Sequence, residues 1–294
     1  MVSDHVRAAG WMSASATAFA LMGVFVKLLP EVAVTEKVLF RNLVTLFVAG
    51  ALALHRGRPL LGHRGNRRFL LARSLFGVAG VSCYFFGISH LQLADAVMLN
   101  KLSPFVVAVL AAIFLSEPMR RPVLLACVTA FVGAMLVIRP RFELSVLPAL
   151  VALSSAFFAG SAYALLRYLR SRESAETIVF FFSAVTVVLL APFALIHRPS
   201  FGPVEWLGLL GIGITAAVGQ IGLTRAYHHG PAAEVAVYSY LTILVSAILG
   251  AALFGEIPGI QSLLGGLLII AGGVIVYHTR TSATGKPAGP GQPS

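Results

Sequence analysis

The chain has 294 residues, of which 58% are hydrophobic and only 11% are charged, and its formal net charge is +11. A soluble globule of this size needs far more polar surface, so the composition excludes one and indicates a protein that crosses a membrane several times. The positive charge does not indicate a nucleic-acid partner, because most arginines lie in short connections between apolar segments, where they set membrane orientation. Cys83 and Cys127 lie singly in apolar stretches, a spacing that predicts neither a disulfide nor a metal site.

Ten apolar segments are long enough to cross a bilayer as helices. They run over residues 8–29, 34–54, 69–89, 94–116, 121–139, 147–168, 176–196, 203–227, 232–254 and 258–278. The sequence therefore predicts an all-α polytopic membrane protein.

The connections between these segments are unevenly charged. With alternate connections assigned to opposite sides of the membrane, 14 Lys and Arg fall on the side of the two termini, and only Lys37, Arg139, Arg141 and Arg198 fall on the other. Positively charged connections stay in the cytoplasm, so both termini are predicted to be cytoplasmic.

One stretch of the chain occurs twice. Asp95 to Glu117 is an apolar helix with an acid at each end, and Glu234 to Glu256 repeats this pattern 139 residues later. The same offset aligns Gly133 with Gly272. Five spans separate the copies, and because five is odd the second copy enters the membrane upside down. This inverted repeat is typical of secondary transporters.

The repeat sets the predicted organisation of the chain. We expect a first five-helix repeat over residues 1–140 and a second, inverted five-helix repeat over 141–280. Residues 281–294 are rich in Gly, Pro and Ser and have no apolar face, which predicts a disordered cytoplasmic tail.

Cationic side chains lie inside the predicted spans, whereas all 11 acids fall in connections or at span ends. Insertion scales put a charge at the centre of a spanning helix at roughly 2.5–3.5 kcal/mol, so Lys101 indicates a functional polar interior. We expect Lys27 to extend to the outer interface and Arg73 to the inner one. Arg41 either pairs toward Glu36 or faces the interior.

An interior cation without a carboxylate partner suits a ligand that carries negative charge. Helical spacing places Met98 on the face of Lys101. Pro104 is predicted to kink this helix and to serve gating, since it removes a helical hydrogen bond. The matching positions in the second copy are Tyr240 and Ile243, so we expect neither charge nor kink there.

Other side chains are predicted to form the walls of a common cavity. Gln220 and Tyr84 lie at corresponding turns of the third and eighth spans. Within the membrane, rings with a hydrogen-bonding end suit a substrate that is part apolar and part polar, and such rings are supplied by Tyr84, Tyr163, Tyr238 and Tyr240. We interpret Phe180 to Phe182 as lipid contact and packing.

Enzyme signatures such as HExxH, GxSxG and GxxxxGK are missing from the sequence, so neither catalysis nor a cofactor is expected. An anion channel is an alternative. Single charges rather than a ring of charges, together with the inverted repeat, favour a carrier that works by alternating access.

Several motifs carry a resemblance to a known family. They are Gly23 to Lys27 at the end of the first span, Arg41, Ser103 to Glu117, and Ile248 to Glu256. On these residues nearly the whole chain resembles the drug/metabolite transporter superfamily, in its ten-helix EamA-type branch. Within that branch it looks most like the bacterial aromatic amino-acid exporters of YddG type.

The resemblance implies a multi-pass protein of the bacterial inner membrane that exports aromatic and other amphipathic amino acids. In that reading Lys101 binds the carboxylate, Tyr84, Tyr163 and Tyr240 contact the ring, and Gln220 binds a polar group. We expect little or no proton coupling, because no carboxylate lies within the membrane. A sugar-phosphate, nucleotide-sugar or drug carrier of the same superfamily stays an alternative. The expected partners are the lipid bilayer and the substrate; a monomer is expected and a homodimer stays open.

Overall fold

The computed structural model describes residues 4–114, 121–139, 146–197, 201–229, 235 and 237–284. Those parts of the chain are helical and contain no strand. The helices are α1 (Asp4–Lys27), α2 (Val34–His55), the short 3-10 helix η1 (Arg64–Asn66), α3 (Arg67–His90), α4 (Leu93–Asn100), α5 (Ser103–Phe114), α6 (Arg121–Ile138), α7 (Leu147–Leu169), α8 (Ala175–His197), α9 (Pro203–His229), α11 (Leu241–Phe254) and α12 (Ile260–Thr284).

Nine helical segments in these ranges are long and apolar enough to cross a membrane, with α4 and the first part of α5 counting as one span. The apolar helix α11 is shorter, with 14 residues, and lies within the predicted ninth span, 232–254. The predicted all-α polytopic fold is therefore confirmed. α12 continues through residues 281–284, which the sequence had assigned to the tail. The rest of the predicted tail, 285–294, and the terminal acids Glu117 and Glu234 lie outside the described residues.

The outer faces of the bundle are apolar. Large side chains such as Phe47, Val188 and Ile196 are more than two-thirds exposed. Such faces are unfavourable in water but suit the hydrocarbon of a bilayer, while the helical backbone satisfies its own hydrogen bonds there.

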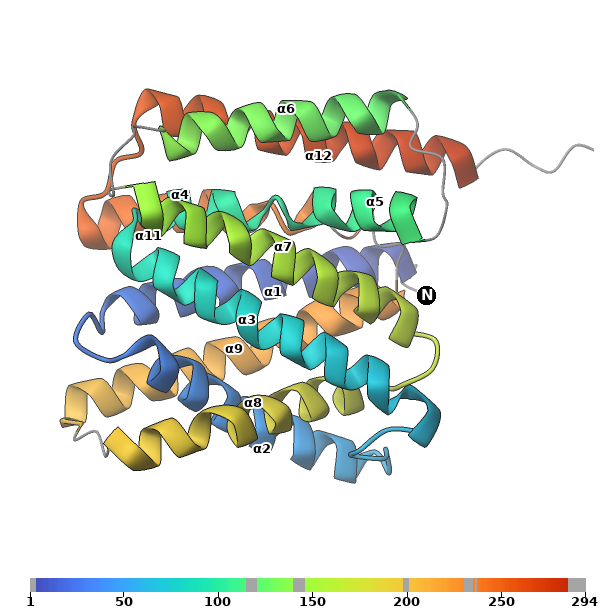
Figure 1. Ribbon diagram of the computed structural model, residues 1–294, viewed down its shortest axis with the longest axis vertical. Coiled ribbons are helices and arrows are strands. Elements are labelled where there is room, and N and C mark those ends of the chain that lie inside the picture. The colour runs from blue at the N-terminus through green and yellow to red at the C-terminus, as the bar shows by residue number, and fades with distance from the viewer. Residues whose placement is uncertain are drawn as a thin grey trace, which may run out of the picture.

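The helices pack with an internal symmetry. If α1, α2, α3, α4 with α5, and α6 are matched in order with α7, α8, α9, α11 and α12, each main contact has a counterpart. α1 packs on α9 as α7 packs on α3, α2 on α9 as α8 on α3, and α1 on α11 as α7 on α5. α2 also packs on its own counterpart α8, and α6 packs on its own counterpart α12. These two pairs form opposite edges of the bundle (Figure 1).

The crossing of α6 and α12 shows the same symmetry at the level of single atoms. A Cβ atom on Gly133 would lie 2.6 Å from the carbonyl oxygen of Gly265, and one on Gly272 would lie 2.8 Å from that of Ala126. The two contacts are equivalent, because Gly133 and Gly272 are 139 residues apart, and so are Ala126 and Gly265. The prediction of two inverted five-helix repeats is thus confirmed, while their exact boundaries stay a prediction. Figure 1 shows the start of α1 and the end of α12 at one end of the bundle, as an even number of spans requires.

The fourth span is interrupted between α4 and α5. There, backbone amides bond to the carbonyl three residues earlier instead of four. Leu102 N donates to the Leu99 carbonyl at 3.2 Å, and Phe105 N donates to the Leu102 carbonyl at 3.0 Å. Pro104 lies in the first turn of α5, where its missing amide proton leaves no helical bond unmade. The interruption expected from Pro104 is present, just before the proline itself.

The ninth span is also interrupted, so the expectation of an unbroken second copy is wrong. A turn at Ser239 and Tyr240 precedes α11, at the position that matches the first interruption. In place of a proline, Thr242 donates both its amide, at 3.2 Å, and its hydroxyl, at 2.9 Å, to the Ser239 carbonyl. The Thr242 hydroxyl thus accompanies this break, at a point where the sequence has no proline.

Candidate functional site

A cavity of about 90 Å³ lies between the two repeats, enclosed by α1, α2, α3, α7, α8, α9 and the two interrupted spans. Both interruptions contribute to it, with Asn100 and Lys101 from one and Ser239 and Thr242 from the other. Interrupted helices that meet within the membrane are the usual way in which transporters build a substrate site. Ligand pockets typically measure roughly 300–1,000 Å³, so the walls must separate to admit a substrate.

Lys101 caps the end of α4 and lines this cavity. Its backbone amide bonds to the Val97 carbonyl at 3.0 Å. Among the ion pairs found in the described parts of the chain, none includes Lys101. The first turn of α5, which follows directly, adds the partial positive charge of a helix N-terminus. Both features favour a negatively charged group at this point of the cavity.

Two arginines share the cavity with Lys101. Arg41 is only 3% exposed, and its two terminal nitrogens donate to Asn42 Oδ1 at 3.1 Å and Gln220 Oε1 at 3.2 Å. Of the two alternatives for Arg41, the structure therefore shows the interior one. Glu36 instead accepts a hydrogen bond from the Ala33 amide at the start of α2.

Arg73 lies in the interior and not at the inner interface, so the prediction for this residue is wrong. It is 3% exposed and lines the cavity, with its guanidinium carbon 4.2 Å from the centre of the Phe182 ring. Phe182 is 2% exposed and lines the cavity too, so the interpretation of this residue as lipid contact is wrong. Both errors have one cause: depth along a span does not reveal which face of a helix a residue occupies.

The predicted aromatic and amide side chains divide into two groups. Tyr84, Tyr163 and Gln220 line the cavity together with Val81 and Leu223, so α3 and α9 do present their corresponding turns to one space.

The second group lies elsewhere. The described lining does not include Met98, Tyr238 or Tyr240. Met98 packs against Gly266 of α12, and Tyr240 packs against Gly273 of the same helix. Tyr238 packs on the separate apolar cluster that contains Leu223 and Tyr227. These three residues stay predictions as substrate contacts.

Lys27 does not extend freely to the outer interface as expected. Its ammonium forms an ion pair with Glu256 and donates to the Leu91 carbonyl at 2.6 Å. Glu256 also accepts the Leu93 amide at 2.8 Å. The end of α1, the turn between α3 and α4, and the end of α11 are therefore joined at the outer end of the bundle.

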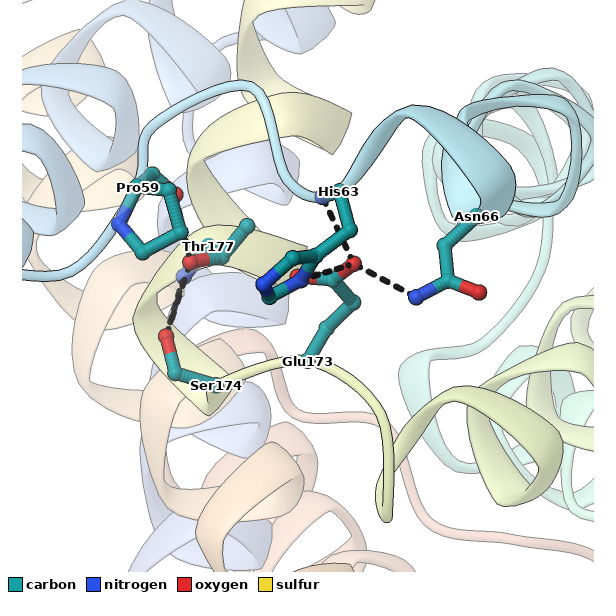
Figure 2. Close-up of polar contacts among 6 residues, drawn as sticks. All are labelled: Pro59, His63, Asn66, Glu173, Ser174 and Thr177. Carbon is teal, nitrogen blue, oxygen red and sulfur yellow. Dashed lines mark hydrogen bonds and ion pairs between the residues drawn. The ribbon is translucent and has the colours of Figure 1, made fainter.

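A second set of polar contacts joins the repeats at the cytoplasmic end. The Glu173 carboxylate lies buried between the α7–α8 connection and the α2–α3 connection (Figure 2). It accepts hydrogen bonds from the His63 amide at 2.8 Å and from Asn66 Nδ2 at 2.7 Å. Close by, Thr177 Oγ1 donates to the Pro59 carbonyl at 2.7 Å. The central cavity is thus bridged by polar contacts at both ends.

A wider cavity of about 570 Å³ opens beside this cluster and is lined largely by arginines and histidines. Arginines of this lining have partners: Arg56 and Arg225 contact Glu176 at 2.7 and 3.2 Å, and Arg170 and Arg172 donate to the Tyr227 and Tyr168 carbonyls at 3.2 and 3.0 Å. This basic lining agrees with the cytoplasmic assignment of this end.

The sequence is similar to known transporters. It is 33% identical over 249 residues to the pseudopaline exporter CntI of Pseudomonas aeruginosa, covering 83% of this chain and 86% of the relative. It is 29% identical over 270 residues to a riboflavin transporter of Brucella anthropi, covering 84% and 91%. A solved crystal structure aligns with 95% of this chain and 97% of its own, with a TM-score of 0.66 at 19% identity, which shows a shared fold.

A sequence model of the EamA-like transporter family matches residues 6–139 and again residues 146–278, so that the two matches together cover nearly all ten spans. The chain therefore belongs to the EamA-like transporter family, within the drug/metabolite transporter superfamily.

Proposed function

We propose that this transporter exports small amphipathic carboxylates, in particular amino acids with an aromatic or otherwise apolar side chain and their derivatives, across the bacterial inner membrane. One observation carries the proposal. Lys101 stands at the interruption of the fourth span, lines the cavity, and has no acidic partner in the part of the chain that the structure describes. A carboxylate would supply the counter-charge that a cation within the membrane needs.

The remaining walls fit the rest of such a molecule. Tyr84 and Tyr163 offer aromatic faces with a hydroxyl at the edge, and Phe182 offers a third ring. Rings of this kind contact an apolar moiety over a large area while keeping a hydrogen-bonding end. The export direction is supported by the relative that is named as a pseudopaline exporter.

A carrier is favoured over a channel by the contacts at the two ends of the cavity. Lys27 with Glu256 bridges the repeats at the outer end, and Glu173 with His63 and Asn66 bridges them at the cytoplasmic end. Alternating access needs one set to open while the other stays formed. The described lining contains no Asp or Glu, so we expect transport without obligatory proton coupling.

Counterflow in proteoliposomes tests this function. Wild-type protein should exchange labelled phenylalanine or tryptophan, with the same rate in the presence and absence of a pH gradient. Lys101→Gln should reduce the flux at least tenfold, because it removes the charge, and Lys101→Arg should retain most of it. Normal flux in Lys101→Gln, or ion currents far above carrier turnover, would contradict the proposal.

A further inference from the structure

The most unusual feature of the cavity is a pair of arginines that lack acidic partners. Arg41 and Arg73 are both 3% exposed, and both contact the Phe182 ring, with guanidinium carbons 5.6 and 4.2 Å from its centre. Nε of Arg41 and both Nε and Nη1 of Arg73 are buried without a hydrogen-bond partner. Buried guanidinium nitrogens are normally satisfied, because leaving them unpaired costs more than leaving a neutral group unpaired.

The surroundings compensate these charges only in part. Arg41 receives two neutral oxygens, from Asn42 and Gln220, and the Phe182 ring attracts both guanidinium groups through its π face. No ion pair found in the described ranges includes either arginine. Two like charges beside one ring also repel each other. An anion placed between them would relieve both the repulsion and the missing hydrogen bonds, and the planar fork of a guanidinium fits a carboxylate with two parallel bonds.

A substrate with a single carboxylate compensates the cations of this cavity only in part. If its carboxylate binds Lys101, the arginine pair stays uncompensated, and the ammonium group of an amino acid meets no acid among the described lining residues. A molecule of net negative charge with two anionic groups on an apolar body supplies one anion for Lys101 and one for the arginine pair. Tyr84, Tyr163 and Phe182 would enclose that body.

We infer that the preferred substrates are amphipathic dicarboxylates, whose second carboxylate binds between Arg41 and Arg73 beside Phe182 while the first binds Lys101. This inference rests on the proposed function and specifies its substrate class. It assigns a specificity-determining role to Arg73.

Two probes of nearly equal shape isolate the second charge. 4-Carboxy-L-phenylalanine has two carboxylates, and 4-carbamoyl-L-phenylalanine carries a neutral amide in place of the ring carboxylate. Each is measured in counterflow with proteoliposomes and, independently of transport, by the rise in melting temperature of the purified protein at saturating ligand.

The wild type should prefer the dicarboxylate by about tenfold or more, since one buried charge-assisted contact contributes about 1.5–3 kcal/mol. Arg73→Gln should reduce this ratio to near one, and Arg73→Lys should restore part of it. Arg68→Gln removes an equal charge from an exposed position of the same helix, so it should keep the wild-type ratio. If the Gln variant does not fold, the ratio of the two probes in the wild type still decides.

Equal binding of both probes by the wild type, or an unchanged ratio in Arg73→Gln, would overturn the inference, as would no binding of either probe. If neither probe is transported but the dicarboxylate alone raises the melting temperature in an Arg73-dependent way, the inference stands and the proposed function fails.

Discussion

Lys27 and Glu256 form an ion pair that joins the end of α1 in the first repeat to the end of α11 in the second. Both side chains are largely shielded, at 18% and 17% exposure. The Leu91 carbonyl and the Leu93 amide complete the contact with the turn between α3 and α4. Any movement that opens the outer end of the cavity by separating α1 from α11 has to break this pair.

Removing the pair should therefore favour the outward-open state. We expect Lys27→Met to speed the labelling of a cysteine placed at Ala162 in the cavity wall by roughly tenfold, since a shielded charged contact contributes about 1.5–3 kcal/mol. An impermeant maleimide added from outside measures the rate, in a background without Cys83 and Cys127.

Leu28→Met, at an exposed apolar position next to Lys27, serves as the control and should keep the slow labelling of the parent, because it leaves the pair and its bonds to Leu91 and Leu93 intact. If Lys27→Met labels no faster than Leu28→Met, the contact does not hold the outer end closed.

Most of the fold could be predicted, because three features can be recognised from residue types alone. They are the apolar spans, the unequal charge of the connections and a repeat with one fixed offset. The contact of Gly133 with Gly265 and that of Gly272 with Ala126 are the spatial form of the same 139-residue offset. The interruption at Ser239 and Tyr240 differs from the prediction because no proline marks it in the sequence.

The site could be predicted only in part. Lys101, Tyr84, Tyr163, Gln220 and Arg41 all line the cavity. Tyr240 is a predicted site residue as a tyrosine within a span and as the counterpart of Lys101, yet it packs against α12 at Gly273. Equivalent positions in inverted repeats occupy equivalent places, but a ring and an ammonium need not point the same way. The interior position of Arg73 depends on the packing of α3 against α7 and α8, which no single helix encodes.

The α6–α12 crossing predicts a strong effect of a single methyl group. Gly133→Ala places a Cβ atom 2.6 Å from a backbone oxygen of Gly265, which cannot move aside without shifting α12. Overpacking of this kind typically costs about 1–3 kcal/mol. The melting temperature of the detergent-solubilised protein should fall.

Gly10→Ala is the matched control for Gly133→Ala. A Cβ atom at Gly10 meets no atom within 4 Å. The exchange should be neutral or raise the melting temperature slightly, since Ala is favoured over Gly in a helix by about 0.8–1 kcal/mol. If both variants lose stability equally, a general sensitivity of glycine positions, and not the close crossing, is responsible.

The buried Glu173 carboxylate predicts a structural and not a chemical role at the cytoplasmic end. Its side chain is fully shielded, and one oxygen accepts the His63 amide and Asn66 Nδ2 (Figure 2). Glu173→Ala should destabilise the protein by about 1–3 kcal/mol, because it leaves buried donors without an acceptor. Glu173→Gln, which keeps one acceptor oxygen, should lose less.

Thermal unfolding followed by circular dichroism measures this difference. Glu31→Ala, at an exposed position in the α1–α2 connection, should change stability by less than about 0.5 kcal/mol. A loss in Glu173→Ala no larger than that of Glu31→Ala would show that the two connections are held together by other contacts.

A pair of tyrosines distinguishes the cavity seen in the structure from the one predicted by sequence symmetry. Tyr84 lines the cavity, whereas the Tyr240 hydroxyl is buried away from it and has no hydrogen-bond partner in the described residues. Tyr84→Phe should raise the KM for aromatic substrates about two- to tenfold, because a hydrogen bond contributes about 0.5–1.5 kcal/mol. Tyr240→Phe should leave KM within twofold and keep or raise the melting temperature, since it removes an unsatisfied buried hydroxyl.

Transport assays over a range of substrate concentrations measure the KM of both variants. A larger rise in KM for Tyr240→Phe than for Tyr84→Phe would assign the substrate contact to Tyr240.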